Sequence, residues 1–163
     1  MVSQVKEKQA IPDESYEPYV HQWHDLVSTT NWEKGRIILE WRETLSDGLE
    51  QDYTDQAWAD RVGGVSAQHV GRLRRVYNRF GEVHADYEGL YWSHFQAALD
   101  WNDAEMWLEG AIQNTWSVSQ MRNQRWEALG KPKGQKPHDE DVVASEYDED
   151  APRDSEVARN KNT

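Results

Sequence analysis

The sequence predicts an all-α protein, a compact multi-helix domain that contains a helix-turn-helix and a C-terminal three-helix group, with disordered tails. Three observations predict this fold class. Apolar residues recur every three or four positions between residues 16 and 129, which is the spacing of one helix face. Alternation of apolar and polar residues never persists for five residues, so no strand is expected. Pairs typical of helix N-termini recur along the second half of the chain.

The composition bounds the class of protein. The 163 residues can form one domain of about 100 residues plus tails. Nine tryptophans and seven tyrosines against two phenylalanines predict a core of rings that carry a polar atom. The absence of cysteine excludes disulfides and thiolate sites. Neither a membrane span nor a signal peptide is apparent, so we expect a cytoplasmic protein, associated with the nucleoid if it binds DNA.

Three segments differ in composition. Residues 1–14 have little to bury and are predicted to be disordered. Residues 15–129 are periodic and are predicted to form the helical domain. Residues 130–163 begin with proline, glycine and lysine and continue as an acidic run without periodicity, so we expect a disordered acidic tail.

Two helices are expected before the helix-turn-helix. The first covers residues 18–28, with Pro18 in its first turn. Its apolar stripe consists of Tyr19, Val20, Trp23, Leu26 and Val27. The second covers residues 31–45, is capped by Asn31 and ends before Gly48. Its buried side is expected to hold Trp32, Ile37 or Ile38, Trp41 and Leu45.

Three shorter helices are expected near residues 93–100, 103–114 and 117–128. Each follows a capping pair three residues apart, namely Ser93 with Gln96, Asn102 with Glu105, and Ser117 with Gln120. Their core candidates are Phe95, Leu99, Met106, Trp107, Ile112, Val118, Met121 and Trp126. On the predicted helix 18–28, His21 and His24 are spaced so that they could bind one metal ion, but the sequence shows no third ligand. Neither a metal nor another cofactor is therefore expected.

Residues 54–80 predict a helix, a tight turn and a second helix. Gly63 and Gly64 supply a turn that can adopt positive φ, and Ser66 can cap the second helix. That helix has a predicted buried stripe of Val70, Leu73, Val76, Tyr77 and Phe80. Residues 66–80 carry four arginines and no acid in a chain of net charge -12.

The polar side of this second helix is typical of a helix that reads a DNA major groove. We expect Gln68 and Arg72 to lie nearest the bases and arginines around them to meet phosphates. The predicted DNA-binding residues are Gln68, His69, Arg72, Arg75, Arg61, Arg74, Asn78 and Arg79. The simpler interpretation is an amphipathic helix with a solvated arginine face.

The order of motifs resembles the central DNA-binding domain of the ParB family of partition proteins, including the KorB repressors, over about residues 54–125. Ala59 and Gly63 match its helix-turn-helix pattern, and residues 90–99 (LYWSHFQAAL) and 116–122 (WSVSQMR) match two later segments. The resemblance implies a regulator of transcription or a factor in plasmid or chromosome partition. The turn is one residue longer here, and the family's nucleotide-binding motif is absent, so the resemblance implies no CTP binding.

The expected partner is therefore double-stranded DNA, with a homodimer or a protein partner as a further possibility. Phosphate-loop, dinucleotide, zincin and serine-hydrolase motifs are absent, so no enzyme activity is expected. A tryptophan-rich helical protein-interaction adaptor is the main alternative, because tryptophan and arginine are also enriched at protein interfaces. An acidic DNA mimic or anti-repressor is the third.

Overall fold

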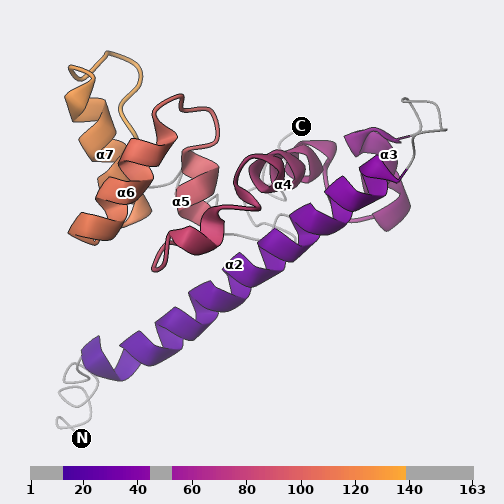
Figure 1. The fold of residues 1–163 in the computed structure, drawn as a ribbon, viewed down its shortest axis with the longest axis horizontal. Coiled ribbons are helices and arrows are strands. Elements are labelled where there is room, and N and C mark those ends of the chain that lie inside the picture. The colour runs from indigo at the N-terminus through magenta and orange to yellow at the C-terminus, as the bar shows by residue number, and fades with distance from the viewer. Residues whose placement is uncertain (1–12, 45–52, 139–163) are drawn as a thin grey trace, which may run out of the picture.

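The computed structural model describes residues 13–44 and 53–138, and this part of the chain is all-α, as predicted. Within it there are six α-helices and one 3-10 helix, and no strand (Figure 1). The helices are α2 (Asp13–Glu43), α3 (Asp55–Val62), α4 (Ala67–Phe80), the 3-10 helix η2 (His84–Asp86), α5 (Trp92–Ala97), α6 (Ala104–Asn114) and α7 (Val118–Ala128). Leu45, Gly48 and the predicted disorder of residues 1–12 and 139–163 lie outside the described residues.

The first two predicted helices are one continuous helix, α2, of 31 residues. Asn31 lies inside it and starts no helix, because residues 28–34 contain no glycine or proline that would interrupt the backbone hydrogen bonds. Pro18 is also internal to the helix, in its second turn, where it lacks the amide hydrogen that would complete one such bond. In Figure 1, α2 is a long rod whose C-terminal half lies beside α3 and α4.

The contact between α2 and α4 depends on Gly35. A Cβ atom at this position would lie 2.6 Å from the carbonyl oxygen of Leu73 and 2.7 Å from the Cβ of Tyr77. Glycine therefore allows the two helix backbones to approach more closely than any other residue would. The close approach buries the predicted α4 stripe, in which Val70, Leu73, Val76 and Phe80 are at most 3% exposed.

Aromatic rings form the centre of the core. Trp32 of α2 stacks on His84 of η2, with ring centroids 3.8 Å apart, and meets Trp92 and Phe95 edge-on. Phe95 in turn packs 5.3 Å from Phe80 of α4. This cluster joins α2, α4 and α5, so the helix-turn-helix and the C-terminal group share one hydrophobic core.

The C-terminal group consists of α5, α6 and α7, as predicted. The predicted cap of Asn102 is wrong, since Asp103 occupies the cap position of α6 and makes no side-chain capping bond. The start of α5 also differs from the prediction. Its cap is Tyr91, whose amide donates to Nδ1 of His94, and Ser93 is buried instead of capping. Nε2 of His94 donates to the carbonyl of Trp116, so the ring ties α5 to the turn before α7. Burial lowers the pKa of His94, in agreement with a neutral ring making both bonds.

Two further expectations for this group have different outcomes. The capping pair of Ser117 and Gln120 is present at the start of α7, where each side chain accepts from the other's backbone amide. Met106, expected in the core, is 61% exposed on α6. The core-facing positions of α6 are occupied by smaller or branched side chains, those of Ala104, Leu108 and Ala111.

Residues 130–138, assigned by composition to the tail, pack back on α7. The indole of Trp126 donates to the carbonyl of Pro132, and the amide of Lys131 donates to the carbonyl of Trp126. Arg122 donates to the carbonyl of His138 at 3.5 Å. This segment therefore belongs to the folded part of the chain.

Candidate nucleic-acid interface

Two capped helices and a glycine turn form the helix-turn-helix. Thr54 caps α3 by accepting from the amide of Ala57, and Ser66 caps α4 by accepting from the amide of His69. Between them, Gly63 and Gly64 both have positive φ, at 75° and 76°, which other residues adopt at a cost. The sequence between α3 and α4 therefore determines where each helix ends and begins.

A salt bridge holds α3 against α4. Asp55 in the first turn of α3 accepts two hydrogen bonds from Arg74 of α4, each 2.9 Å long. These bonds, and the charge of Arg74, hold the pKa of Asp55 below its usual range. Arg42, near the end of α2, lies 3.4 Å from the same carboxylate. We call Asp55, Arg74 and Arg42 the α3–α4 latch.

Gly71 makes room for the latch. A Cβ atom on this residue would lie 2.8 Å from Oδ2 of Asp55. A glycine inside a helix costs about 1 kcal/mol relative to alanine, so its presence here is explained by the close carboxylate. Asp55 and Gly71 were not among the predicted functional residues. For Gly71 the sequence offered one signal, a glycine in the middle of a periodic helix. For Asp55 it offered none, because the bond from Arg74 joins residues 19 positions apart.

One side of α4 faces away from the core. The residues on it are spaced by three or four and begin in the first turn, and they are Gln68, Arg72, Arg75 and Arg79, with Asn78 beside them. Gln68, Arg75 and Asn78 are exposed and Arg72 is half-buried. Arg75 also bonds the carbonyl of Gly71 in its own helix, at 3.3 Å. This side combines an amide donor and acceptor with guanidinium groups.

Three of the predicted DNA-binding residues have side chains that contact other parts of the domain, and of these Arg79 is exposed. His69 is only 6% exposed, on the core side of α4. Arg74 is held by the latch. Arg79 donates to the carbonyls of Ala98, Leu99 and Trp101, just after α5. Arg79 thereby ties α4 to the segment that follows α5.

Arg61, the remaining predicted residue, is exposed in the last turn of α3. It follows the exposed acid Asp60, which accepts from Gln56 at 2.8 Å. The predicted set therefore separates into an accessible group and a structural group. The accessible group, which we call the α4 face, consists of Gln68, Arg72, Arg75 and Asn78, with Arg61 as an outlying member.

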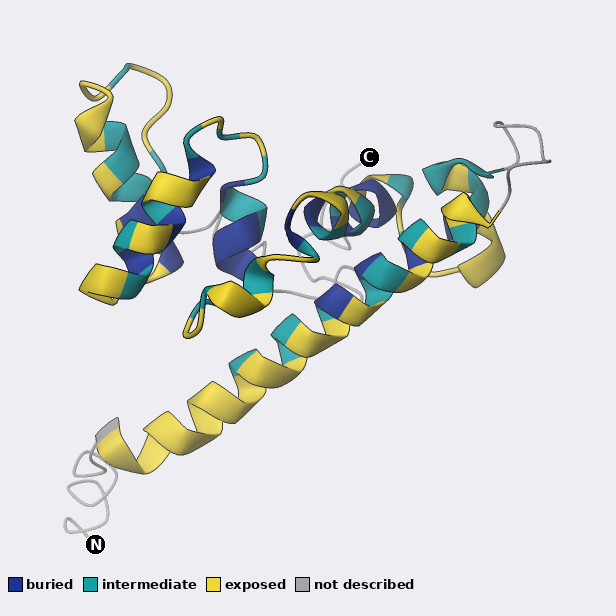
Figure 2. Cartoon of the chain, viewed as in Figure 1, coloured by how far each residue is buried: buried dark blue, intermediate teal, exposed yellow. Residues whose placement is uncertain are grey.

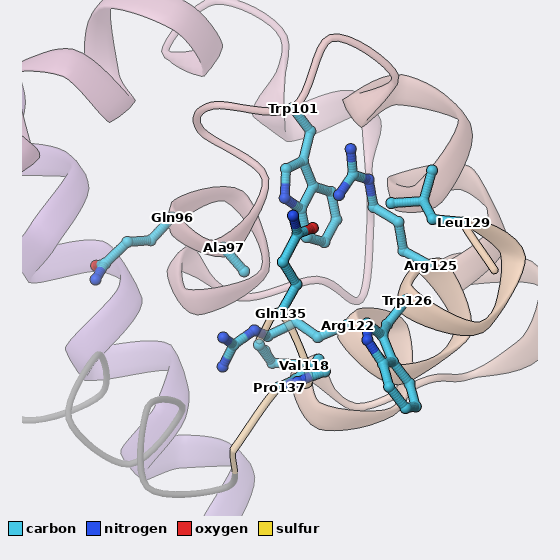
Figure 3. A pocket seen from close by; sticks show the side chains of 10 residues that line it. All are labelled: Gln96, Ala97, Trp101, Val118, Arg122, Arg125, Trp126, Leu129, Gln135 and Pro137. Atoms are coloured by element: carbon cyan, nitrogen blue, oxygen red, sulfur yellow. The ribbon is translucent and has the colours of Figure 1, made fainter. Parts of the chain in front are cut away.

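A second basic feature is an open cavity of about 330 Å³ in the C-terminal group. It lies between α5, α7 and the returning segment 130–138, and Arg122 and Arg125 line it together with Trp101 and Trp126 (Figure 3). Arg125 is bonded to Asp103 at 3.0 Å and its guanidinium stacks 4.4 Å from the Trp101 ring. Arg125 therefore connects α7 to the start of α6.

Among residues 13–44 and 53–138, no group of three or more histidine, aspartate or glutamate side chains is placed to hold a metal ion. None of the helices described is both long and apolar enough to cross a membrane. No protein-family model, curated protein or solved structure matches this chain.

Proposed function

We propose that the protein is a sequence-specific DNA-binding protein of ParB/KorB-like type, acting in transcriptional regulation or in partition. The observation that carries the proposal is the α4 face, on which Gln68, Arg72 and Arg75 follow one another along one side of the second helix of a helix-turn-helix. An amide can bond adenine bidentately and a guanidinium can bond guanine or phosphate. In this proposal Gln68 and Arg72 meet bases.

Two arginines that the sequence assigned to DNA phosphates have structural contacts instead, so the phosphate contacts are reassigned. Arg74 and Arg79 hold α4 in place through Asp55 and through carbonyls after α5. Phosphate contacts are therefore assigned to Arg75 and Arg61, which are exposed. With so few cations on a chain of net charge -12, we expect binding to be weak and sensitive to salt.

The test is binding of the full chain to duplexes selected from a randomised DNA pool, at low and moderate salt. Gln68→Ala should cost about 1 to 3 kcal/mol on the preferred duplex and relax base preference at one position. Arg75→Ala should weaken all duplexes alike and lower the salt slope by about one. Arg36→Ala is the matched control, because Arg36 is a half-exposed arginine of α2 paired with Glu33 and Glu40. Binding that is insensitive to salt, or equal in Arg75→Ala and Arg36→Ala, would refute the proposal.

A protein-interaction adaptor is the second candidate, and a different observation favours it. Large apolar side chains, among them Tyr19, Trp23 and Leu26, are exposed on the N-terminal half of α2 (Figure 2). Exposed apolar patches of this kind mark interaction surfaces. The adaptor becomes the preferred function if no selected duplex binds the protein while the fold is intact.

A further inference from the structure

One side of the N-terminal half of α2 exposes five large apolar residues. They are Tyr16 (52% exposed), Tyr19 (72%), Val20 (47%), Trp23 (68%) and Leu26 (67%), and we call them the N-terminal stripe. An exposed tryptophan and two exposed tyrosines on consecutive turns are unusual for a lone helix face in water. Within residues 13–44 and 53–138, no other segment covers the stripe.

In the N-terminal half of α2, the stripe is not the side that packs on the domain. His21 and Ser28 mark the packed side there, through the 2.6 Å bond between Nδ1 of His21 and the hydroxyl of Tyr91 and the bond from the Trp92 amide to Ser28. At 100° per residue, the centre of the stripe lies about 150°, or two fifths of a turn, round the helix from that side. The rest of the described chain thus cannot cover the stripe without moving α2.

We propose that a second copy of this chain covers the stripe, through antiparallel pairing of two α2 helices. Tyr16, Val20, Trp23 and Val27 are spaced by four, three and four residues, the spacing of a coiled-coil seam. With the two-fold axis between residues 21 and 22, Tyr16 of one copy faces Val27 of the other, and Val20 of one copy faces Trp23 of the other. Each large ring then meets a small branched side chain, and the same pairs repeat on both sides of the axis.

The area agrees with a dimer. An aromatic side chain offers about 150 to 250 Å² to a partner, so at the exposures above the stripe offers on the order of 600 Å² per copy. Two copies together bury at most about 1,200 Å², which is the lower limit of stable, specific interfaces. The predicted affinity is accordingly in the micromolar range.

Charge selects the antiparallel arrangement. The acids of this half are Asp13, Glu14, Glu17 and Asp25, and residues 13–32 contain no lysine or arginine. A parallel pair would place the two acidic N-terminal turns side by side and Trp23 against Trp23. The antiparallel pair separates these turns and sets them opposite the neutral residues 26–30.

Sedimentation of the full chain from about 5 to 200 µM, without DNA, tests the proposal. The mass should rise from 19.1 kDa toward twice that value. Trp23→Glu should raise the dimer dissociation constant at least tenfold. Met106→Glu is the matched control, because Met106 is 61% exposed on α6 and its replacement adds the same charge. A wild-type chain that stays at 19.1 kDa, or equal dissociation constants for the two variants, would overturn the proposal. Because no DNA is present, neither result bears on DNA binding.

Thiol crosslinking tests the register, since the chain has no cysteine of its own. Tyr16→Cys mixed with Val27→Cys should crosslink through a short bifunctional maleimide, whereas each variant alone should crosslink at least fivefold less. Crosslinking of each variant alone, without enrichment in the mixture, would overturn the antiparallel arrangement. Circular dichroism of each variant checks that the helices are intact.

Discussion

The two halves of α2 share a periodic apolar pattern but have different environments. Each half carries apolar and aromatic residues at helical spacing. In the C-terminal half, Trp32 and Ile38 are buried at 8% and 3% exposure, whereas in the N-terminal half Trp23 is 68% exposed (Figure 2). The difference shows that a periodic apolar stripe specifies a helix but not the surface that covers it. Substitutions in the two halves should therefore differ in size.

The largest effect is expected at Trp32. Trp32→Ala should lower the free energy of unfolding by about 3 to 5 kcal/mol, because it removes a ring packed on His84, Trp92 and Phe95. Urea unfolding followed by circular dichroism measures the change. A loss below about 1 kcal/mol would mean that the C-terminal half of α2 packs no more closely than the N-terminal half.

Gly35→Ala tests the helix crossing itself. Alanine favours a helix by about 1 kcal/mol over glycine, so an uncrowded site would be stabilised. Here the added Cβ lies within 2.7 Å of the Leu73 carbonyl and the Tyr77 Cβ, so we expect a net loss of about 1 to 3 kcal/mol. Thermal unfolding distinguishes the two signs, and an increase in stability would show that α2 and α4 are further apart.

Asp55→Asn tests the α3–α4 latch, which adjoins the end of the C-terminal half of α2. Replacing the carboxylate should cost about 1 to 2 kcal/mol at pH 7, because the bonds from Arg74 become weaker. Arg74 lowers the pKa of Asp55 in the folded state, so the carboxylate stabilises the fold above its unfolded pKa. That contribution is lost as pH falls below about 3.8 and through the folded pKa.

Unfolding measured between pH 7 and pH 3 checks this linkage. The difference between wild type and Asp55→Asn should shrink as the solution becomes acidic. Asp60→Asn is the control, since Asp60 is exposed on the same helix and accepts its hydrogen bond from the neutral side chain of Gln56. A pH-independent difference would contradict the contribution assigned to the charge.

The smallest effect is expected at Trp23. At about 1 µM protein, where a micromolar dimer is mostly dissociated, Trp23→Ala should change the free energy of unfolding by less than about 0.5 kcal/mol. At about 100 µM the wild-type melting temperature should exceed that of the variant, because association stabilises the folded chain. A large loss at the low concentration would show that Trp23 is covered within one chain.

Much of the fold was predictable because it depends on neighbours along the chain. The all-α class, the helix-turn-helix and the caps of Ser66 and Ser117 follow from periodicity, glycine placement and capping pairs. The buried stripe of α4 followed from the same spacing, and so did the side on which Gln68 and Arg75 are exposed. These properties involve residues within a few positions of one another.

The candidate site was less predictable for the opposite reason. The sequence placed four arginines on α4, but only tertiary contacts assigned Arg74 to Asp55, 19 residues away, and Arg79 to carbonyls about 20 residues away. Tertiary contacts also decided that α2 is continuous, that its C-terminal half is buried and that Met106 is exposed. Periodicity determines which side chains share a helix face, whereas the covering of that face depends on segments that meet only when the chain folds.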